Sequence, residues 1–126
     1  MLRLLLVSNN MDPLADFSSA LQKDNDIELI CANSGETALK MIKDNAIDLV
    51  ISDEELGDMS GLAFISKLIL VNPMLNCVAV SSLSEKDFHE ASEGLGVMNH
   101  LPVNPGADDA EELLKNLRRI KGLESG

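Results

Sequence analysis

The sequence contains no tryptophan or tyrosine and only three phenylalanines among its 126 residues. It can therefore build neither an aromatic platform for stacking nucleobases nor an aromatic shelf for sugars. Basic residues are also scarce, since 10 Lys and Arg stand against 21 Asp and Glu, which gives a formal charge of −11. A charge of this sign repels phosphate backbones and anionic lipid surfaces, so direct nucleic-acid binding and membrane attachment are not expected.

Cysteines and long apolar runs are equally few. Cys31 and Cys77 form no CxxC motif and have no His at ligand spacing, so we expect two free thiols, no zinc site and a cytoplasmic location. The apolar run over residues 1–7 is too short for a signal-peptide core, and Lys67 interrupts the longest apolar stretch, which argues against a membrane-spanning segment.

The length and the 45% hydrophobic content fit one globular domain. We expect this domain over residues 1–121, with residues 122–126 as a flexible tail or the start of a linker. Five compact apolar runs alternate with stretches of helical periodicity. The runs, which predict strands buried on both faces, cover residues 2–7, 27–32, 48–52, 76–81 and 97–101.

Amphipathic stripes follow each apolar run, and Ser34, Ser60 and Ser84 stand at the expected helix N-caps. One predicted stripe, on the helix that follows Ser84, runs from Phe88 to Leu95. Five βα units in series predict a doubly wound α/β fold, in which a parallel sheet has helices on both faces.

Ligand sites in such sheets lie beyond the carboxyl ends of the strands. No glycine-rich nucleotide loop and no GxSxG nucleophile elbow is present, so an ordinary enzyme is not predicted. An aspartate at a strand end, Asp53, is the strongest candidate for chemistry, while Glu54, Glu55 and Asp58 are interpreted as a solvated acidic loop. The four strand-end segments read Ser8-Asn9-Asn10, Asp53-Glu54-Glu55, Ser81-Ser82 and Pro102-Val103-Asn104-Pro105.

Residues 48–53, followed by Met59-Ser60-Gly61, resemble the phosphoacceptor strand and loop of bacterial response-regulator receiver domains. Residues 78–82 resemble the fourth strand of that family with its hydroxyl residue, and residues 96–101 resemble the entry into its fifth strand. The resemblance covers roughly residues 2–121. It implies a flavodoxin-like three-layer fold with strand order 2-1-3-4-5 and a role in two-component (phosphorelay) signal transduction.

The resemblance also implies roles for individual side chains. Asp53 would be the phosphoacceptor and a Mg²⁺ ligand, Ser81 the hydroxyl that contacts the phosphoryl group, and the backbone carbonyl of Glu55 a further metal ligand. His100 stands at the position of the aromatic residue that, together with Ser81, makes up the family's switch.

Two charged elements of the family pattern are missing. Its acidic pair falls on Ser8-Asn9 or on Asn9-Asn10, and its lysine falls on Val103 or Asn104. A unit charge pair at about 4 Å is worth roughly 4 kcal/mol at an effective dielectric near 20, so losing these charges matters. We therefore expect the Mg²⁺ site at Asp53, Glu55, Asn9 and Asn10 to be weak or lost.

Three interpretations stay open. In the first, a histidine kinase or phosphotransfer protein modifies Asp53, and the face of the fourth helix, fifth strand and fifth helix rearranges. In the alternative, the domain is a pseudo-receiver whose same face binds a protein partner without phosphorylation. A small-ligand binder that uses the strand-end crevice is a third, weaker interpretation, because a fold alone does not fix a function.

Overall fold

The computed structural model describes residues 1–122. It is an alternating series of strands and helices, as the sequence predicts. In chain order the elements are β1 (Leu2–Val7), the 3-10 helix η1 (Asp12–Leu14), α1 (Ala15–Leu21), β2 (Ile27–Ala32), α2 (Gly35–Asp44), β3 (Leu49–Ser52), α3 (Gly61–Val71), β4 (Asn76–Val80), α4 (Glu85–Ala91), β5 (Asn99–Leu101) and α5 (Ala107–Ile120).

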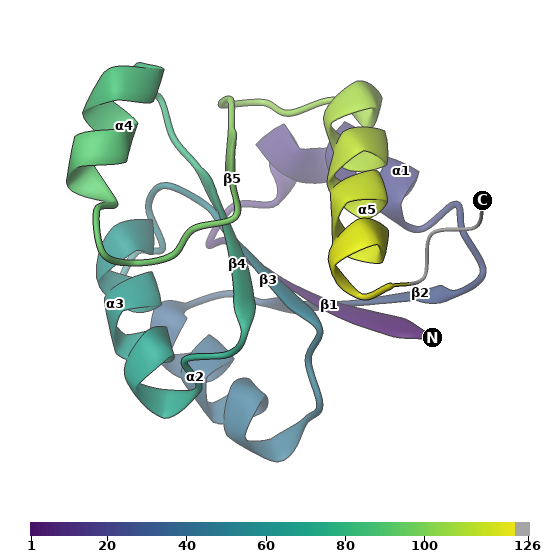
Figure 1. The fold of residues 1–126 in the computed structure, drawn as a ribbon, viewed down its shortest axis with the longest axis horizontal. Coiled ribbons are helices and arrows are strands. Elements are labelled where there is room, and N and C mark those ends of the chain that lie inside the picture. The colour runs from purple at the N-terminus through teal and green to yellow at the C-terminus, as the bar shows by residue number, and fades with distance from the viewer. Residues whose placement is uncertain (123–126) are drawn as a thin grey trace.

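The five strands form one parallel sheet in the order β2-β1-β3-β4-β5. This confirms the predicted fold class and strand order. Figure 1 shows the sheet in the middle, with α1 and α5 on one side and α2, α3 and α4 on the other. The register aligns the last residues of neighbouring strands, because Val7 lies opposite Ala32 of β2 and Ser52 of β3.

Three predicted strand bounds are wrong by one or two residues. Asp48 and Ser81 lie just outside β3 and β4, although the N–H of Asp48 donates to Arg3 O at 2.8 Å and that of Ser81 donates to Leu101 O at 3.0 Å. Val97 and Met98 precede β5 rather than belong to it. Gly94 and Gly96 turn the chain there with left-handed φ angles of 85° and 66°, so the strand begins only at Asn99.

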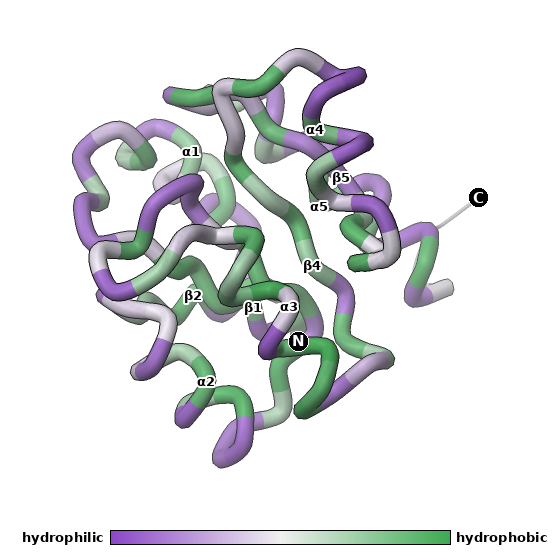
Figure 2. The backbone as a smooth tube through the Cα atoms, turned by 90° about the vertical axis from the view of Figure 1, so that its left-hand side faces the viewer, coloured by the Kyte–Doolittle hydropathy of each residue, from purple (hydrophilic) through white to green (hydrophobic). Residues whose placement is uncertain are grey.

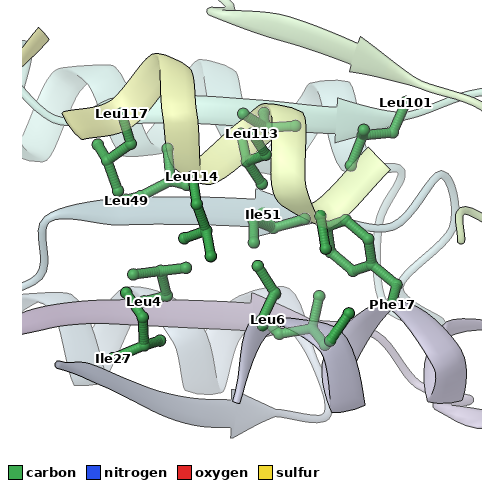
Figure 3. Close-up of a cluster of buried hydrophobic side chains, with 14 of the residues drawn as sticks. Leu4, Leu6, Phe17, Ile27, Leu49, Ile51, Leu101, Leu113, Leu114 and Leu117 are labelled. Atoms are coloured by element: carbon green, nitrogen blue, oxygen red, sulfur yellow. The ribbon is translucent and has the colours of Figure 1, made fainter. Parts of the chain in front are cut away.

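Two hydrophobic clusters hold the layers together. Leucines and isoleucines of β1, β3 and β5 pack against α1 and α5 on one face of the sheet (Figure 3). On the other face, apolar residues of the same sheet pack against α2, α3 and α4. In Figure 2 hydrophobic residues follow the strands, and hydrophilic residues alternate with them along the outer helices. The three inner strands β1, β3 and β4 are thus buried on both faces, as their unbroken apolar runs predict, whereas the two outer strands β2 and β5 are only partly buried.

The predicted helix caps are confirmed. The hydroxyls of Ser34, Ser60 and Ser84 each accept a hydrogen bond of 3.1 Å from the backbone N–H three residues on. The predicted helical stripe from Phe88 to Leu95 is too long, because α4 ends at Ala91 and Leu95 lies beyond the helix. No helix in residues 1–122 is long and apolar enough to cross a membrane. The predicted tail lies outside the described residues except for Gly122.

Candidate functional site

Asp53 follows the last residue of β3, at the edge of the sheet where all the strands end. Its N–H donates to Val7 O of β1 at 2.9 Å, which fixes its backbone beside the end of that strand. The first residue of α3, Gly61, approaches this backbone so closely that a Cβ atom there would lie 2.2 Å from Asp53 O. Helix α3 can therefore start at this point only because Gly61 has no side chain.

The carboxylate of Asp53 has two short hydrogen bonds. Its Oδ1 accepts from the N–H of Glu54 at 2.8 Å, and its Oδ2 accepts from the hydroxyl of Ser8 at 2.6 Å. Ser8 is only 1% exposed, and its Oγ also lies 2.8 Å from Asn10 O. A hydroxyl has one proton to donate, and the shorter contact to a charged oxygen is the stronger of the two. Ser8 is thus the direct partner of Asp53.

The two asparagines after Ser8 are placed differently from it. Both are exposed. Asn9 lies against Gly57, where a Cβ atom would be 3.0 Å from its Nδ2, and Gly57 has a left-handed φ of 87°. Asn10 instead accepts the N–H of Asp12 on its Oδ1 at 3.2 Å, which is a local turn contact. The structure therefore brings Ser8 to Asp53 and turns the Asn10 amide toward its own loop.

The residues around Asp53 do not fit a strong magnesium site. Mg²⁺ prefers octahedral oxygen coordination with carboxylate ligands. Among residues 1–122, no three His, Cys, Asp or Glu side chains gather so that they could hold a metal ion. Glu55, whose backbone carbonyl the resemblance assigns to the metal, is exposed and pairs with Ser60 in an isolated bridge. Asp53 is thus the one carboxylate of the predicted ligand set, and a neutral hydroxyl already occupies its Oδ2.

Glu54 links the ends of β3 and β4, a contact that sequence analysis missed. Its Oε2 accepts from the N–H of Ser82 at 2.5 Å, and both of its carboxylate oxygens accept from the Ser82 hydroxyl, at 2.9 and 3.0 Å. The hydrogen bond from the Ser82 N–H lowers the pKa of Glu54, burial opposes this shift, and the hydroxyls of Ser82 and Ser81 add to it. Glu54 is exposed, in keeping with its interpretation as part of a solvated acidic loop, but it also has a fixed partner that this interpretation did not include.

Asp58 is also a structural acid. Its carboxylate accepts from the N–H groups of Gly35 and Glu36, each at 3.0 Å, and these two hydrogen bonds lower its pKa. Since these N–H groups open α2, Asp58 caps a helix that starts 23 residues earlier. Asp58 is exposed, as its interpretation as a solvated loop residue requires, but no local sequence signal identifies a cap at this separation.

Ser81 and His100 meet at the ends of β4 and β5. Ser81 is buried, and its Oγ accepts from the N–H of Leu83 at 3.1 Å. The Nε2 atom of His100 lies 3.1 Å from Ser81 O, so it donates there when it carries the ring proton. The His100 ring stacks on Phe88 of α4, with centroids 4.1 Å apart and planes at 11°. The two predicted switch residues are therefore in contact with each other and with α4.

A groove of about 510 Å³ opens beside these residues, and Val103 forms part of its wall. Val103 is 45% exposed, and Asn104 has a left-handed φ of 58°. The groove holds no ammonium group at either position where the resemblance would place one. Its lining consists of Ser81, Ser82, Leu83, Glu85, His100, Pro102 and Val103.

The parallel sheet and its strand order define a flavodoxin-like α/β domain, with an aspartate at the end of its central strand β3. The response regulator receiver domain family matches residues 4–115, so the chain belongs to that family. Its structure is similar to the chemotaxis response regulator CheY4 of Vibrio cholerae, with a TM-score of 0.82, 18% identity and coverage of 93% of this chain and 98% of that one. A receiver domain from Clostridium thermocellum gives a TM-score of 0.82 at 20% identity, with 98% of each chain covered.

Two curated relatives are much longer than this chain. The protein-glutamate methylesterase/protein-glutamine glutaminase 1 of Paramagnetospirillum magneticum is 26% identical over 129 aligned residues, which cover 94% of this chain and 34% of that protein. The corresponding protein of Azospirillum brasilense is 26% identical over 83 residues, 65% of this chain and 21% of that protein. The chain thus spans about a third or less of the relatives it matches.

Proposed function

We propose that this receiver domain acts as a protein interaction module that does not depend on Mg²⁺-supported phosphorylation of Asp53. The observation that carries the proposal is the 2.6 Å hydrogen bond from the Ser8 hydroxyl to Asp53 Oδ2. Receiver domains generally bind Mg²⁺ at an acidic site. Here a neutral, buried hydroxyl stands against the carboxylate where a strong divalent site needs a second negative charge.

The two absent carboxylates remove a large part of the electrostatic attraction for Mg²⁺. Each absent carboxylate removes roughly 4 kcal/mol of attraction at about 4 Å and an effective dielectric near 20, before desolvation. Even a third of that value is about a tenfold loss in affinity for each unit charge. Losing two carboxylates therefore weakens Mg²⁺ binding by about a hundredfold or more.

In this function, the surface that meets the partner is the face formed by α4, β5 and α5. Leu83 and Val103, which are 41% and 45% exposed, line the groove beside α4 and β5 and offer apolar contacts there. The negative net charge favours a protein partner over nucleic acid. The domain, over residues 1–121, would act as a regulatory rather than an enzymatic unit in the cytoplasm.

Phosphorylation of Asp53 by a histidine kinase or phosphotransfer protein is the second candidate function. Its support is that Asp53 is partly exposed at the end of β3 and that Ser81 follows the neighbouring strand β4. In this case the Ser81 hydroxyl would contact the phosphoryl group. A weak metal site would then use Asp53, the Glu55 carbonyl and the Asn9 and Asn10 amides.

Thermal unfolding across a Mg²⁺ series separates the two functions. Three proteins are compared: wild type, the double variant Ser8→Asp/Asn9→Asp, and the charge-matched control Asn9→Asp/Asn10→Asp. The first variant adds a carboxylate at the position that contacts Asp53, whereas the control places its second charge at Asn10, whose amide serves a local turn.

We expect wild type and the control to shift by less than about 1 °C at about 10 mM Mg²⁺, because ligand linkage needs a concentration above Kd. The Ser8→Asp/Asn9→Asp variant should melt lower than wild type in chelator, since like charges repel, and rise by several degrees with Mg²⁺. Stabilisation of wild type by low-millimolar Mg²⁺ would overturn the proposal and favour the phosphorylated switch.

A further inference from the structure

We propose that the Glu54 carboxylate fixes the connection between β4 and α4 through its hydrogen bonds from Ser82, and thereby holds the partner-binding face in one conformation. We call this Glu54–Ser82 contact the latch. This inference deepens the proposed function, because it explains how that face is set without a phosphoryl group. It rests on a continuous series of contacts that runs from the end of β3 to α4.

The first contact joins the Glu54 carboxylate, which is exposed, to two donors of Ser82. The Glu54 carboxylate accepts a hydrogen bond from the backbone N–H of Ser82 at 2.5 Å, and its two oxygens lie 2.9 and 3.0 Å from the Ser82 hydroxyl. Two donors on one residue therefore converge on one carboxylate, and a charged acceptor makes these hydrogen bonds about twice as strong as neutral ones. The neighbouring acid Glu55 is exposed, and among the described residues it makes no side-chain hydrogen bond or ion pair.

The remaining contacts continue through the connection. Ser81, the residue before the latched Ser82, accepts the N–H of Leu83 on its hydroxyl at 3.1 Å and places its carbonyl 3.1 Å from Nε2 of His100. The His100 ring stacks on Phe88, a buried residue of α4. A fixed position for Ser82 therefore constrains the backbone of Ser81, and through it the ring stack that joins β5 to α4.

Hydroxyl and N–H donors that converge at the end of a strand suit an oxyanion, and here a side chain of the protein supplies the negative oxygens. Glu54 follows Asp53 directly and crosses from the end of β3 to the end of β4. The charge that fixes this connection is thus permanent and needs neither a metal ion nor a phosphoryl donor.

The test compares Glu54→Gln with Glu55→Gln, two variants that remove one negative charge each from adjacent exposed positions. Both are measured by NMR with chelator present and no phosphoryl donor. In Glu54→Gln the amide of Ser82 should lose about tenfold or more of its hydrogen-exchange protection, and the ring protons of His100 should change chemical shift as the stack on Phe88 loosens. Glu55→Gln should match wild type in both readouts.

The latch is refuted if, in Glu54→Gln, either the exchange protection of the Ser82 amide or the chemical shifts of the His100 ring protons keep their wild-type values. It is also refuted if Glu55→Gln changes these two readouts as much as Glu54→Gln does. Ser82→Ala, which removes the hydroxyl donor and keeps the backbone, provides the same test if Glu54→Gln does not fold, and should shift the His100 signals in the same direction. Because no Mg²⁺ is present, failure of the latch leaves the magnesium experiment unaffected, and Mg²⁺ binding by wild type leaves the latch intact.

Discussion

Replacing Gly61 by alanine tests how closely α3 is seated on the backbone that carries Asp53. A Cβ atom at Gly61 would lie 2.2 Å from Asp53 O and 3.0 Å from Ser52 Oγ. Ordinary van der Waals contact begins near 3.4 Å, so the helix start must move by about 1 Å. That movement strains the hydrogen bond from the Gly61 N–H to Glu54 O, which is 2.9 Å long.

The expected loss of stability follows from three contributions. Overpacking against an unyielding backbone costs about 3 kcal/mol, and the strained hydrogen bond about 1 kcal/mol. The better helix propensity of alanine returns about 1 kcal/mol. The net loss is therefore about 3 kcal/mol, which corresponds to a fall in Tm of about 12 °C for a domain of this size.

Gly106→Ala is the matched control. Gly106 stands before α5 with a φ of −109°, and a Cβ atom there would meet nothing within 4 Å. Its replacement should cost less than about 1 kcal/mol. Urea unfolding followed by circular dichroism measures both variants. If Gly61→Ala and Gly106→Ala agree within about 0.5 kcal/mol, the close seating of α3 described above is refuted.

Two further predictions concern ionisable groups away from the site. Burial raises the pKa of the Cys77 thiol to about 12, so at pH 8 a thiol reagent should label exposed Cys31 in the folded protein and Cys77 only after unfolding; labelling of both at one rate would contradict this burial. Burial raises the pKa of Asp48, but the N–H of Arg3 and the ammonium of Lys121, 2.9 Å away, lower it by more. Because the pKa of Asp48 is lower in the folded than in the unfolded protein, its ionised carboxylate stabilises the fold above about pH 4. This stabilisation is lost as the pH falls through the pKa of the folded state. Asp48→Asn should therefore cost about 1 kcal/mol at pH 7 and flatten the acid limb of a stability curve; an unchanged acid limb would count against this ion pair.

The strands and helix starts could be predicted because their signals are local. Unbroken apolar runs indicated strands covered on both faces, and Ser34, Ser60 and Ser84 each bond an N–H three residues away. The strand order came from the family resemblance rather than from any local pattern. The end of α4 was misjudged because the apolar spacing continues to Leu95 while Gly94 already has a left-handed φ.

The chemical contacts of the site could not be read from the sequence. Ser8 and Asp53 are 45 residues apart, Glu54 and Ser82 are 28 apart, and Asp58 caps a helix 23 residues before it. Side chains of these types are ordinary turn residues in most loops, and only the parallel register brings the strand ends together. The sequence therefore correctly predicts that the site lies at the carboxyl ends of the strands, but it does not predict which acids have hydrogen-bond partners there.

Intact-mass spectrometry after incubation with a small-molecule phosphoryl donor and Mg²⁺ tests the central claim most directly. Wild type and Asp53→Asn are treated side by side, with the Ser8→Asp/Asn9→Asp variant as the protein in which the missing charge is supplied. We predict that wild type, like Asp53→Asn, gains no phosphoryl mass. A phosphoryl mass on wild type that is absent from Asp53→Asn would contradict the account and show a phosphorylated switch.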